Sequence, residues 1–210
     1  MLEINKKINE IPFYLTKKIS EEIGDDPDII NLSRGQAGFR PILRVYEEAK
    51  KLINPEDKTF FKYEKSAGSK VLRESIAKFY KKQFNLDITS DSVIVTDGGT
   101  GGIGMALQFL TNPGDEIIIP DPSYPFYILA AEHGLENRIV KRVSIGKDKV
   151  TREKLEPIIT PKTRLLILTS PHNPTGVVYD EKTLKGIMEL AKEKNFFVLY
   201  DENHFPEVHD

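Results

Sequence analysis

The distribution of hydrophobic positions changes along the chain. From position 92 onward, short runs of consecutive aliphatic residues alternate with stretches whose apolar positions recur at helical spacing. Uninterrupted apolar runs predict strands that are buried on both faces, as in a parallel sheet that helices cover on both sides. The five predicted strands are 93–95, 116–119, 138–143, 165–168 and 196–200, and the helices between them are 100–110, 123–133, 151–159 and 181–194.

The part of the chain before position 92 is charged and predominantly helical in its spacing. We expect helices over 16–23, 42–53 and 71–84, and a glycine-rich loop that ends at Pro41. Parallel strands joined by right-handed helical crossovers form a doubly wound α/β layer. The sequence therefore predicts an α/β fold, with residues 1–41 as an N-terminal arm and residues 42–210 in a larger domain.

Composition and charge restrict the class of protein. Hydrophobic residues make up 39% of the 210 positions and charged residues 30%, which is typical of a soluble globular protein. The formal net charge of −2 gives no electrostatic reason to expect nucleic acid or an anionic membrane as a partner. The absence of cysteine excludes disulfides and cysteine metal sites. Because the sequence has neither a membrane-length apolar run nor a signal-peptide core, we expect a cytoplasmic protein. We also expect no metal site.

Polar motifs follow the predicted strands, where ligand sites form in parallel sheets. Gly98, Gly99 and Thr100 stand where the first strand turns into a helix. Backbone amides and a hydroxyl at a helix N-terminus make a cradle for phosphate. A tight glycine-rich turn without a ligand explains these residues, taken alone, equally well.

Three further side chains stand at strand ends in constrained settings. Tyr124 lies between two prolines and could stack on a flat heterocycle, although an isolated tyrosine there also fits simple packing. Two prolines also constrain the loop of Asn173, which presents its amide as a donor unless the loop is only a rigid turn. Asp201 ends the last apolar strand, where a carboxylate needs a cationic partner such as a protonated ring nitrogen.

Together these motifs resemble the class I and II aminotransferases, the aspartate-aminotransferase-like enzymes of fold type I that use pyridoxal 5'-phosphate (PLP). The resemblance runs from about Ile30 to Asp201 and is most specific in residues 112–116, 122–125 and 170–176. It implies a three-layer α/β/α large domain with a mostly parallel sheet. It also implies that the chain is the N-terminal portion of such an enzyme, truncated before the lysine strand and the C-terminal small domain.

The resemblance assigns a part of the cofactor to each strand-end motif. Gly98, Gly99 and Thr100 would hold the PLP phosphate, and Tyr124 would stack on the pyridine ring. Asn173 would donate to the phenolic oxygen. Asp201 would pair with the protonated pyridine nitrogen, which keeps the ring an electron sink.

Three other residues match family positions less simply. Tyr63 matches a tyrosine that reaches the phosphate of the partner subunit in a homodimer, and Gly35 matches a glycine of the loop that closes over the substrate carboxylate. His204 stands where the family usually has a tyrosine that also binds the phenolic oxygen. Histidine can donate the same bond, but the Asp-Glu-x-His pattern resembles the cystathionine β-lyase-like C–S lyases of the same superfamily.

The implied reaction transfers an amino group between an amino acid and a 2-oxo acid. The family's Schiff-base lysine lies in a Ser-x-Ser-Lys context that this sequence lacks. We therefore expect no catalytic residue for this step in the chain, and no turnover by the chain alone. The alternatives that stay open are a C–S lyase, a non-catalytic PLP-fold binding or scaffold protein, and a split enzyme whose second chain supplies the lysine.

Overall fold

The computed structural model describes residues 15–24, 26–30, 32, 39–53, 56, 62–134, 138–146 and 148–205. The chain divides into two compact units, with the boundary between Val95 and Thr96. The boundary after residue 41 that the sequence suggests stays a prediction.

The unit before the boundary is helical in its described residues. It contains α1 (Leu15–Ile23), α2 (Leu43–Leu52), α3 (Lys70–Phe84) and the short 3-10 helix η2 (Ser90–Ser92), so the three helices predicted for this part are confirmed. The Arg73 guanidinium is buried and donates to the backbone oxygens of Gly68, at 3.2 Å, and Ser90, at 2.7 Å. This side chain therefore ties the start of α3 to η2.

The strand predicted at 93–95 is wrong, because no described strand pairs with these residues. The backbone N–H of Val95 instead donates to the oxygen of Ala67, at 3.0 Å. A Cβ added to Gly68, whose φ is +93°, would lie only 2.6 Å from the Cβ of Val95. Gly68 thus lets a turn approach the extended segment closely, and that turn takes the place of a partner strand.

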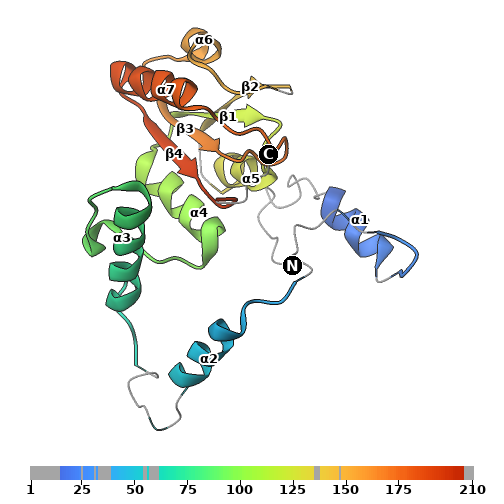
Figure 1. Cartoon of the computed structure of the whole chain (residues 1–210). Helices are drawn as coiled ribbons and strands as arrows, with labels where there is room; N and C mark the ends of the chain where they lie inside the picture. The colour runs from blue at the N-terminus through green and yellow to red at the C-terminus, as the bar shows by residue number, and fades with distance from the viewer. Residues whose placement is uncertain are drawn as a thin grey trace, which may run out of the picture. The chain divides into compact units, whose positions relative to one another are not determined.

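The unit that begins at Thr96 is a parallel sheet with helical crossovers. Its four strands have the order β2-β1-β3-β4 and pair in parallel throughout (Figure 1), which confirms the other four predicted strands. The elements are α4 (Gly98–Leu110), β1 (Glu116–Asp121), α5 (Pro125–Glu132), β2 (Ile139–Ser144), α6 (Arg152–Leu155), η3 (Glu156–Ile158), β3 (Thr163–Thr169), α7 (Glu181–Lys194) and β4 (Phe197–Asp201).

The hydrophobic core has two parts, one on each face of the sheet. Ile117 and Ile119 of β1 pack with residues of α4 and α5, whereas Ile118, between them, packs with residues of α7. Alternate residues of a strand point to opposite faces, so both faces of β1 are covered. Figure 1 shows the same three layers, with α7 on one side of the sheet and α4 and α5 on the other.

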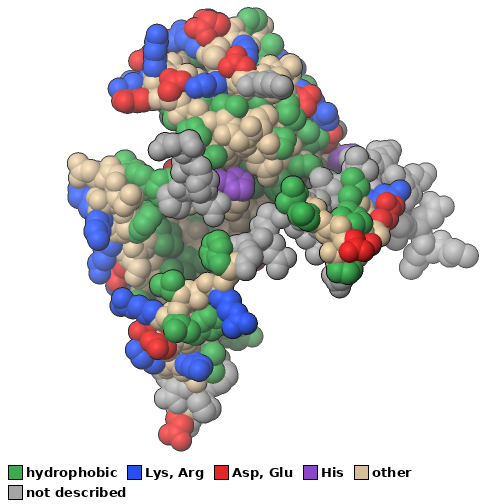
Figure 2. Space-filling model, turned by 45° about the vertical axis from the view of Figure 1, so that its right-hand side comes forward, with side chains coloured by type: hydrophobic (Ala, Val, Ile, Leu, Met, Phe, Trp, Pro, Cys, Tyr) green, Lys and Arg blue, Asp and Glu red, His purple; other side chains and the backbone are tan. Residues whose placement is uncertain are grey.

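Hydrophobic side chains also remain at the surface of the helical unit. None of the described residues of α2 is buried, and Leu43 and Leu52 of this helix are 78% and 66% exposed. Figure 2 shows apolar side chains, in green, at several places on the surface. In the ranges that the structure describes, no helix is both long enough and apolar enough to cross a membrane.

The fold should be most sensitive to mutation in the buried central strands. Leu166 of β3 is completely buried, so Leu166→Ala should lower the free energy of unfolding by about 2–5 kcal/mol, because it removes buried methyl groups and leaves a cavity. Urea unfolding followed by circular dichroism measures this change. Met188→Ala on α7, whose side chain is 54% exposed, is the control and should change the free energy by less than about 0.5 kcal/mol. Equal effects of the two variants would contradict this account of the core.

Candidate functional site

A small pocket opens at the carboxyl ends of β3 and β4, within the unit that begins at Thr96. Its volume is about 190 Å³. Pockets for drug-sized ligands span roughly 300–1,000 Å³, so this one suits a compact ligand. It is lined by Gly99, Thr100, Ile103, Tyr124, Tyr127, Thr169, Asn173, Asp201, Asn203 and His204.

One wall of the pocket is the first turn of α4. Gly98 has φ +81°, a conformation that favours glycine, and a Cβ added to Gly98 or Gly99 would meet nothing within 4 Å. The N-cap residue Asp97 makes no side-chain hydrogen bond to this turn. The N–H of Gly98 already donates to the backbone oxygen of Thr96, at 2.8 Å, whereas Gly99 and Thr100 line the pocket at the start of this 13-residue helix. Such a helix start favours an anion.

A second wall is aromatic and comes from the start of α5. Tyr124 directly precedes this helix, lines the pocket and is 37% exposed. Its ring packs edge to face against that of Tyr127, with centroids 5.5 Å apart and an interplanar angle of 83°. The partly exposed ring of Tyr124 can therefore stack on a flat ligand while Tyr127 supports it from the side.

Asn173 lies in a loop that is held by its own hydrogen bonds. The backbone N–H of His172 donates to the oxygen of Val177, at 2.9 Å, and the N–H of Gly176 donates to the oxygen of His172, at 2.7 Å. His172 Nδ1 also lies 2.8 Å from the Thr175 hydroxyl. These bonds enclose Asn173, so its side chain reaches the pocket from a fixed loop.

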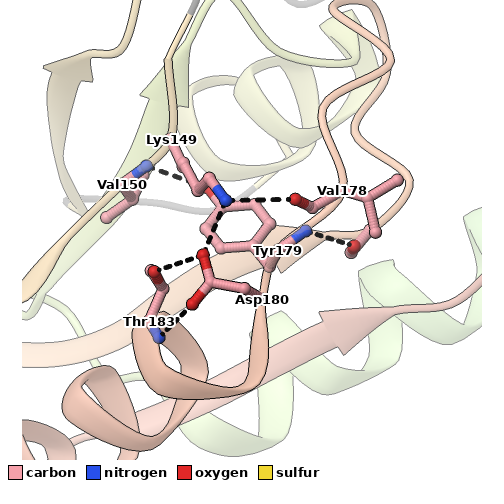
Figure 3. Close-up of polar contacts among 7 residues, drawn as sticks. Lys149, Val150, Val178, Tyr179, Asp180 and Thr183 are labelled. Carbon is pink, nitrogen blue, oxygen red and sulfur yellow. Dashed lines mark hydrogen bonds and ion pairs between the residues drawn. The ribbon is translucent and has the colours of Figure 1, made fainter.

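The far end of this loop is anchored at the start of α7 (Figure 3). The buried Tyr179 hydroxyl accepts a hydrogen bond from the backbone N–H of Val150, at 3.0 Å. Asp180 caps α7 by accepting from the backbone N–H of Thr183, at 2.8 Å, and forms an ion pair of 2.7 Å with Lys149. The bond to Lys149 and the cap bonds together lower the pKa of Asp180 well below its usual range. The loop of Asn173 therefore leads into a fixed helix start.

The acidic end of the pocket is Asp201, the last residue of β4. Its Oδ2 accepts a hydrogen bond of 2.7 Å from the hydroxyl of Tyr127, and its Oδ1 accepts one of 2.8 Å from the backbone N–H of Asn203. Burial, and then the bond to Asp201, raise the pKa of the Tyr127 hydroxyl, which therefore stays protonated at neutral pH. Sequence reasoning missed Tyr127. The only signal was its spacing of three residues from Tyr124, which places both on one side of a helix.

The structure brings together most of the residues that the sequence singled out. Gly98 begins the helix that bounds the pocket. Tyr63 lies in the other unit and is fully exposed, and Gly35 lies outside the described residues. The predicted residues that line the pocket are Gly99, Thr100, Tyr124, Asn173, Asp201 and His204.

A larger groove, of about 840 Å³, lies at the starts of α6 and α7, but its chemistry is different. Its described lining contains no aromatic residue, and several of its charged groups already form ion pairs. Arg152 lies 2.6 Å from Glu193, and Lys185 lies 2.7 Å from Glu181. The described residues also contain no group of three histidine or acidic side chains that could hold a metal ion. The pocket at the strand ends is therefore the candidate site.

Comparison with known proteins identifies the family. The family model "Aminotransferase class I and II" matches residues 27–206. The chain is 36% identical over 184 residues to a probable aspartate aminotransferase of Methanocaldococcus jannaschii. The aligned residues make up 87% of this chain and 48% of the relative. The chain is 37% identical over 202 residues to a probable N-acetyl-LL-diaminopimelate aminotransferase of Bacillus subtilis, covering 95% of this chain and 50% of the relative. The chain thus spans about half the length of these relatives.

Solved structures show the same relationship. An aspartate aminotransferase of Thermus thermophilus with maleate superimposes with a TM-score of 0.84 at 26% identity, over 96% of this chain and 53% of the other. An aspartate aminotransferase of Thermotoga maritima gives 0.80 at 32% identity, over 95% and 54%. These matches confirm the predicted α/β fold with a mostly parallel sheet. The chain belongs to the class I and II aminotransferase family.

The loop of Asn173 makes the stability of the fold depend on pH through His172. This side chain is only 3% exposed, and burial lowers its pKa below the ordinary value. Around pH 6 the folded protein therefore binds fewer protons at His172 than the unfolded chain does. The contribution of the neutral ring to the free energy of unfolding is fully present above about pH 6.5 and is lost as the pH falls below that value.

We expect the thermal midpoint of the wild type to decrease as the pH is lowered from about 7 to about 5. This decrease should be smaller in His172→Gln. Thermal unfolding at a series of pH values measures the effect. His133→Gln is the control, because His133 is less buried than His172. Parallel pH profiles of the wild type and His172→Gln would show that the ring does not titrate in this way.

Proposed function

We propose that the pocket at the strand ends binds PLP in an enzyme that transfers an amino group between an amino acid and a 2-oxo acid. The observation that carries this proposal is the convergence of four chemically different groups on one small pocket. They are a glycine-rich helix start, an aromatic ring, an amide and a hydrogen-bonded carboxylate. The two relatives named above, both aminotransferases, support the same reaction class.

The residues present fit the parts of this cofactor. The Gly99 amide and the Thr100 hydroxyl would bind the phosphate, because a helix start favours an anion. We assign Gly98 to the same phosphate site, where its N–H, which now donates to Thr96, would have to turn toward the ligand. Tyr124 would stack on the ring. Asn173 would donate to the phenolic oxygen, and His204, which also lines the pocket, can donate to the same atom.

Asp201 would act at the ring nitrogen. Each of its two oxygens accepts one hydrogen bond, and each keeps a further lone pair that can accept from a ligand. The carboxylate therefore can hold a proton on a ring nitrogen that faces it. PLP supplies an electron sink when its ring nitrogen is protonated, and this is the chemistry that amino-group transfer requires.

Residues outside the pocket would complete the enzyme. We assign the exposed Tyr63 to the phosphate site of a second subunit in a homodimer, and Gly35 to the loop that covers the substrate carboxylate. Residues 1–41 would be the N-terminal arm and residues 42–210 part of the cofactor-binding large domain. A cytoplasmic location completes the proposal, since amino-acid metabolism of this kind uses soluble substrates.

The 210 residues alone would bind the cofactor without turning over substrate. None of the described residues that line the pocket is a lysine, and none of the lysines of the chain lies in the Ser-x-Ser-Lys context of the family. A lysine is needed to move a proton between the substrate and the cofactor. We therefore expect reversible binding in the pocket, and reduction with borohydride should trap PLP only on exposed lysines outside the pocket.

Equilibrium dialysis with PLP tests the cofactor assignment. Asp201→Ala and Thr100→Ala should each weaken binding roughly ten- to a hundredfold, because each removes a hydrogen bond to a charged part of the ligand. Asp148→Ala is the matched control. Asp148 is an exposed aspartate that pairs with Lys154, away from the pocket, and its loss should leave the affinity unchanged. Equal effects of Asp201→Ala and Asp148→Ala would contradict the assignment, and a wild type without affinity for PLP would favour a non-catalytic scaffold.

His204 supports a second candidate function, a C–S lyase of the cystathionine β-lyase type. The residue lines the pocket beside Asp201, in the position where aminotransferases usually have a tyrosine. In a complete enzyme that contains these residues, pyruvate release from cystathionine would identify the lyase. Amino transfer that depends on added 2-oxo acid, and no pyruvate release, would identify the aminotransferase.

A further inference from the structure

Tyr127 is a pocket residue that the proposed chemistry does not use directly. It lies in the first turn of α5 and is only 2% exposed. Its ring supports the ring of Tyr124, and its hydroxyl reaches Asp201, which is 74 residues away in the chain. Tyr127 is thus in contact with both the aromatic wall and the acidic end of the pocket.

The hydroxyl of Tyr127 limits the orientations that the Asp201 carboxylate can adopt. It holds Oδ2 from α5 at 2.7 Å, while the backbone N–H of Asn203 holds Oδ1 at 2.8 Å. A carboxylate with one hydrogen bond can rotate about its terminal bond, whereas one held at both oxygens has a fixed plane. Without Tyr127, only the local turn at Asn203 would hold the carboxylate.

Tyr127 acts on Asp201 as a donor only. Burial and then the carboxylate raise the pKa of this hydroxyl, so its proton stays on the phenol throughout the neutral range. A donated bond leaves the remaining lone pairs of Asp201 free to accept from a cationic N–H. The arrangement therefore selects a ligand whose positive end meets the carboxylate and whose flat face meets Tyr124.

We propose that Tyr127 is a positioning residue that fixes the Asp201 carboxylate relative to the Tyr124 ring, and so sets how strongly the pocket recognises a protonated ring nitrogen. This inference rests on the proposed function, because it assumes that the ligand is a flat heteroaromatic phosphate. It predicts that loss of one phenol oxygen weakens recognition of a single ring atom and leaves the phosphate contacts intact.

The chain offers a matched pair of variants for the test. Tyr127→Phe keeps the ring against Tyr124 and removes only the donor to Asp201. Tyr179→Phe removes the hydroxyl of a second buried tyrosine, 6% exposed, which bonds to Val150 and does not line the pocket. The two variants should lose similar stability, since each gives up one buried hydrogen bond.

The measurement compares the dissociation constants of PLP and of its 1-deaza analogue, in which a carbon replaces the ring nitrogen. The wild type and Tyr179→Phe should prefer PLP by roughly ten- to a hundredfold, the range for a hydrogen bond to a charged group. Tyr127→Phe should reduce this preference at least about threefold, and Asp201→Ala should abolish it. A Tyr127→Phe variant with the wild-type preference would overturn the inference and leave the proposed function standing.

A wild type that binds both ligands equally, or neither, would overturn the proposed function and this inference with it. A second measurement needs no ligand. With carbon-13 at the Cζ of tyrosine, Asp201→Asn should shift the Tyr127 resonance at neutral pH, because the hydroxyl loses its carboxylate acceptor. The Tyr179 resonance should not move. An unchanged Tyr127 resonance would show that the hydroxyl is not bonded to Asp201, and would overturn the inference by itself.

Discussion

The burial of the apolar centres of the two middle strands is the constraint on which the rest of the structure depends. Ile117, Ile118 and Ile119 of β1 are fully buried, with helices over both faces. No polar side chain can be placed along such a strand without losing its contacts with water. Polar groups therefore collect where the strands end, and because the strands are parallel, these ends lie on one edge of the sheet.

The candidate site follows from this constraint and from the connections between strands. The start of α4, the start of α5, the loop of Asn173 and the tip of β4 lie far apart in sequence, yet they line one pocket of about 190 Å³. Each has its own means of being fixed. The loop of Asn173 is closed by bonds around His172, and Asp201 is held from both sides by Tyr127 and Asn203. A site with this many independent supports is preorganised for binding.

The sequence predicts those parts of the fold and of the site that depend on neighbouring residues in the chain. Apolar runs located β1 and β3, and the constrained loops placed Tyr124 and Asn173 at strand ends. Residues 93–95 have the same apolar pattern but form no strand, because pairing requires a neighbour that the pattern does not reveal, and here the turn at Gly68 lies against them. Tyr127 escaped sequence reasoning because its partner is 74 residues away. Sequence motifs alone assign Tyr63 and Gly35, so their roles stay predictions.

The proposed function requires that the pocket at the strand ends hold PLP in one orientation, with the phosphate at the start of α4. Titration of the nitrogen-15-labelled chain with PLP, followed by amide NMR, measures this orientation. We expect the largest shifts at the amides of Gly99 and Thr100, with further shifts at Asn173 and Asn203, beside the ring. Shifts confined to the groove at the starts of α6 and α7, around Thr183 and Gly186, would contradict it.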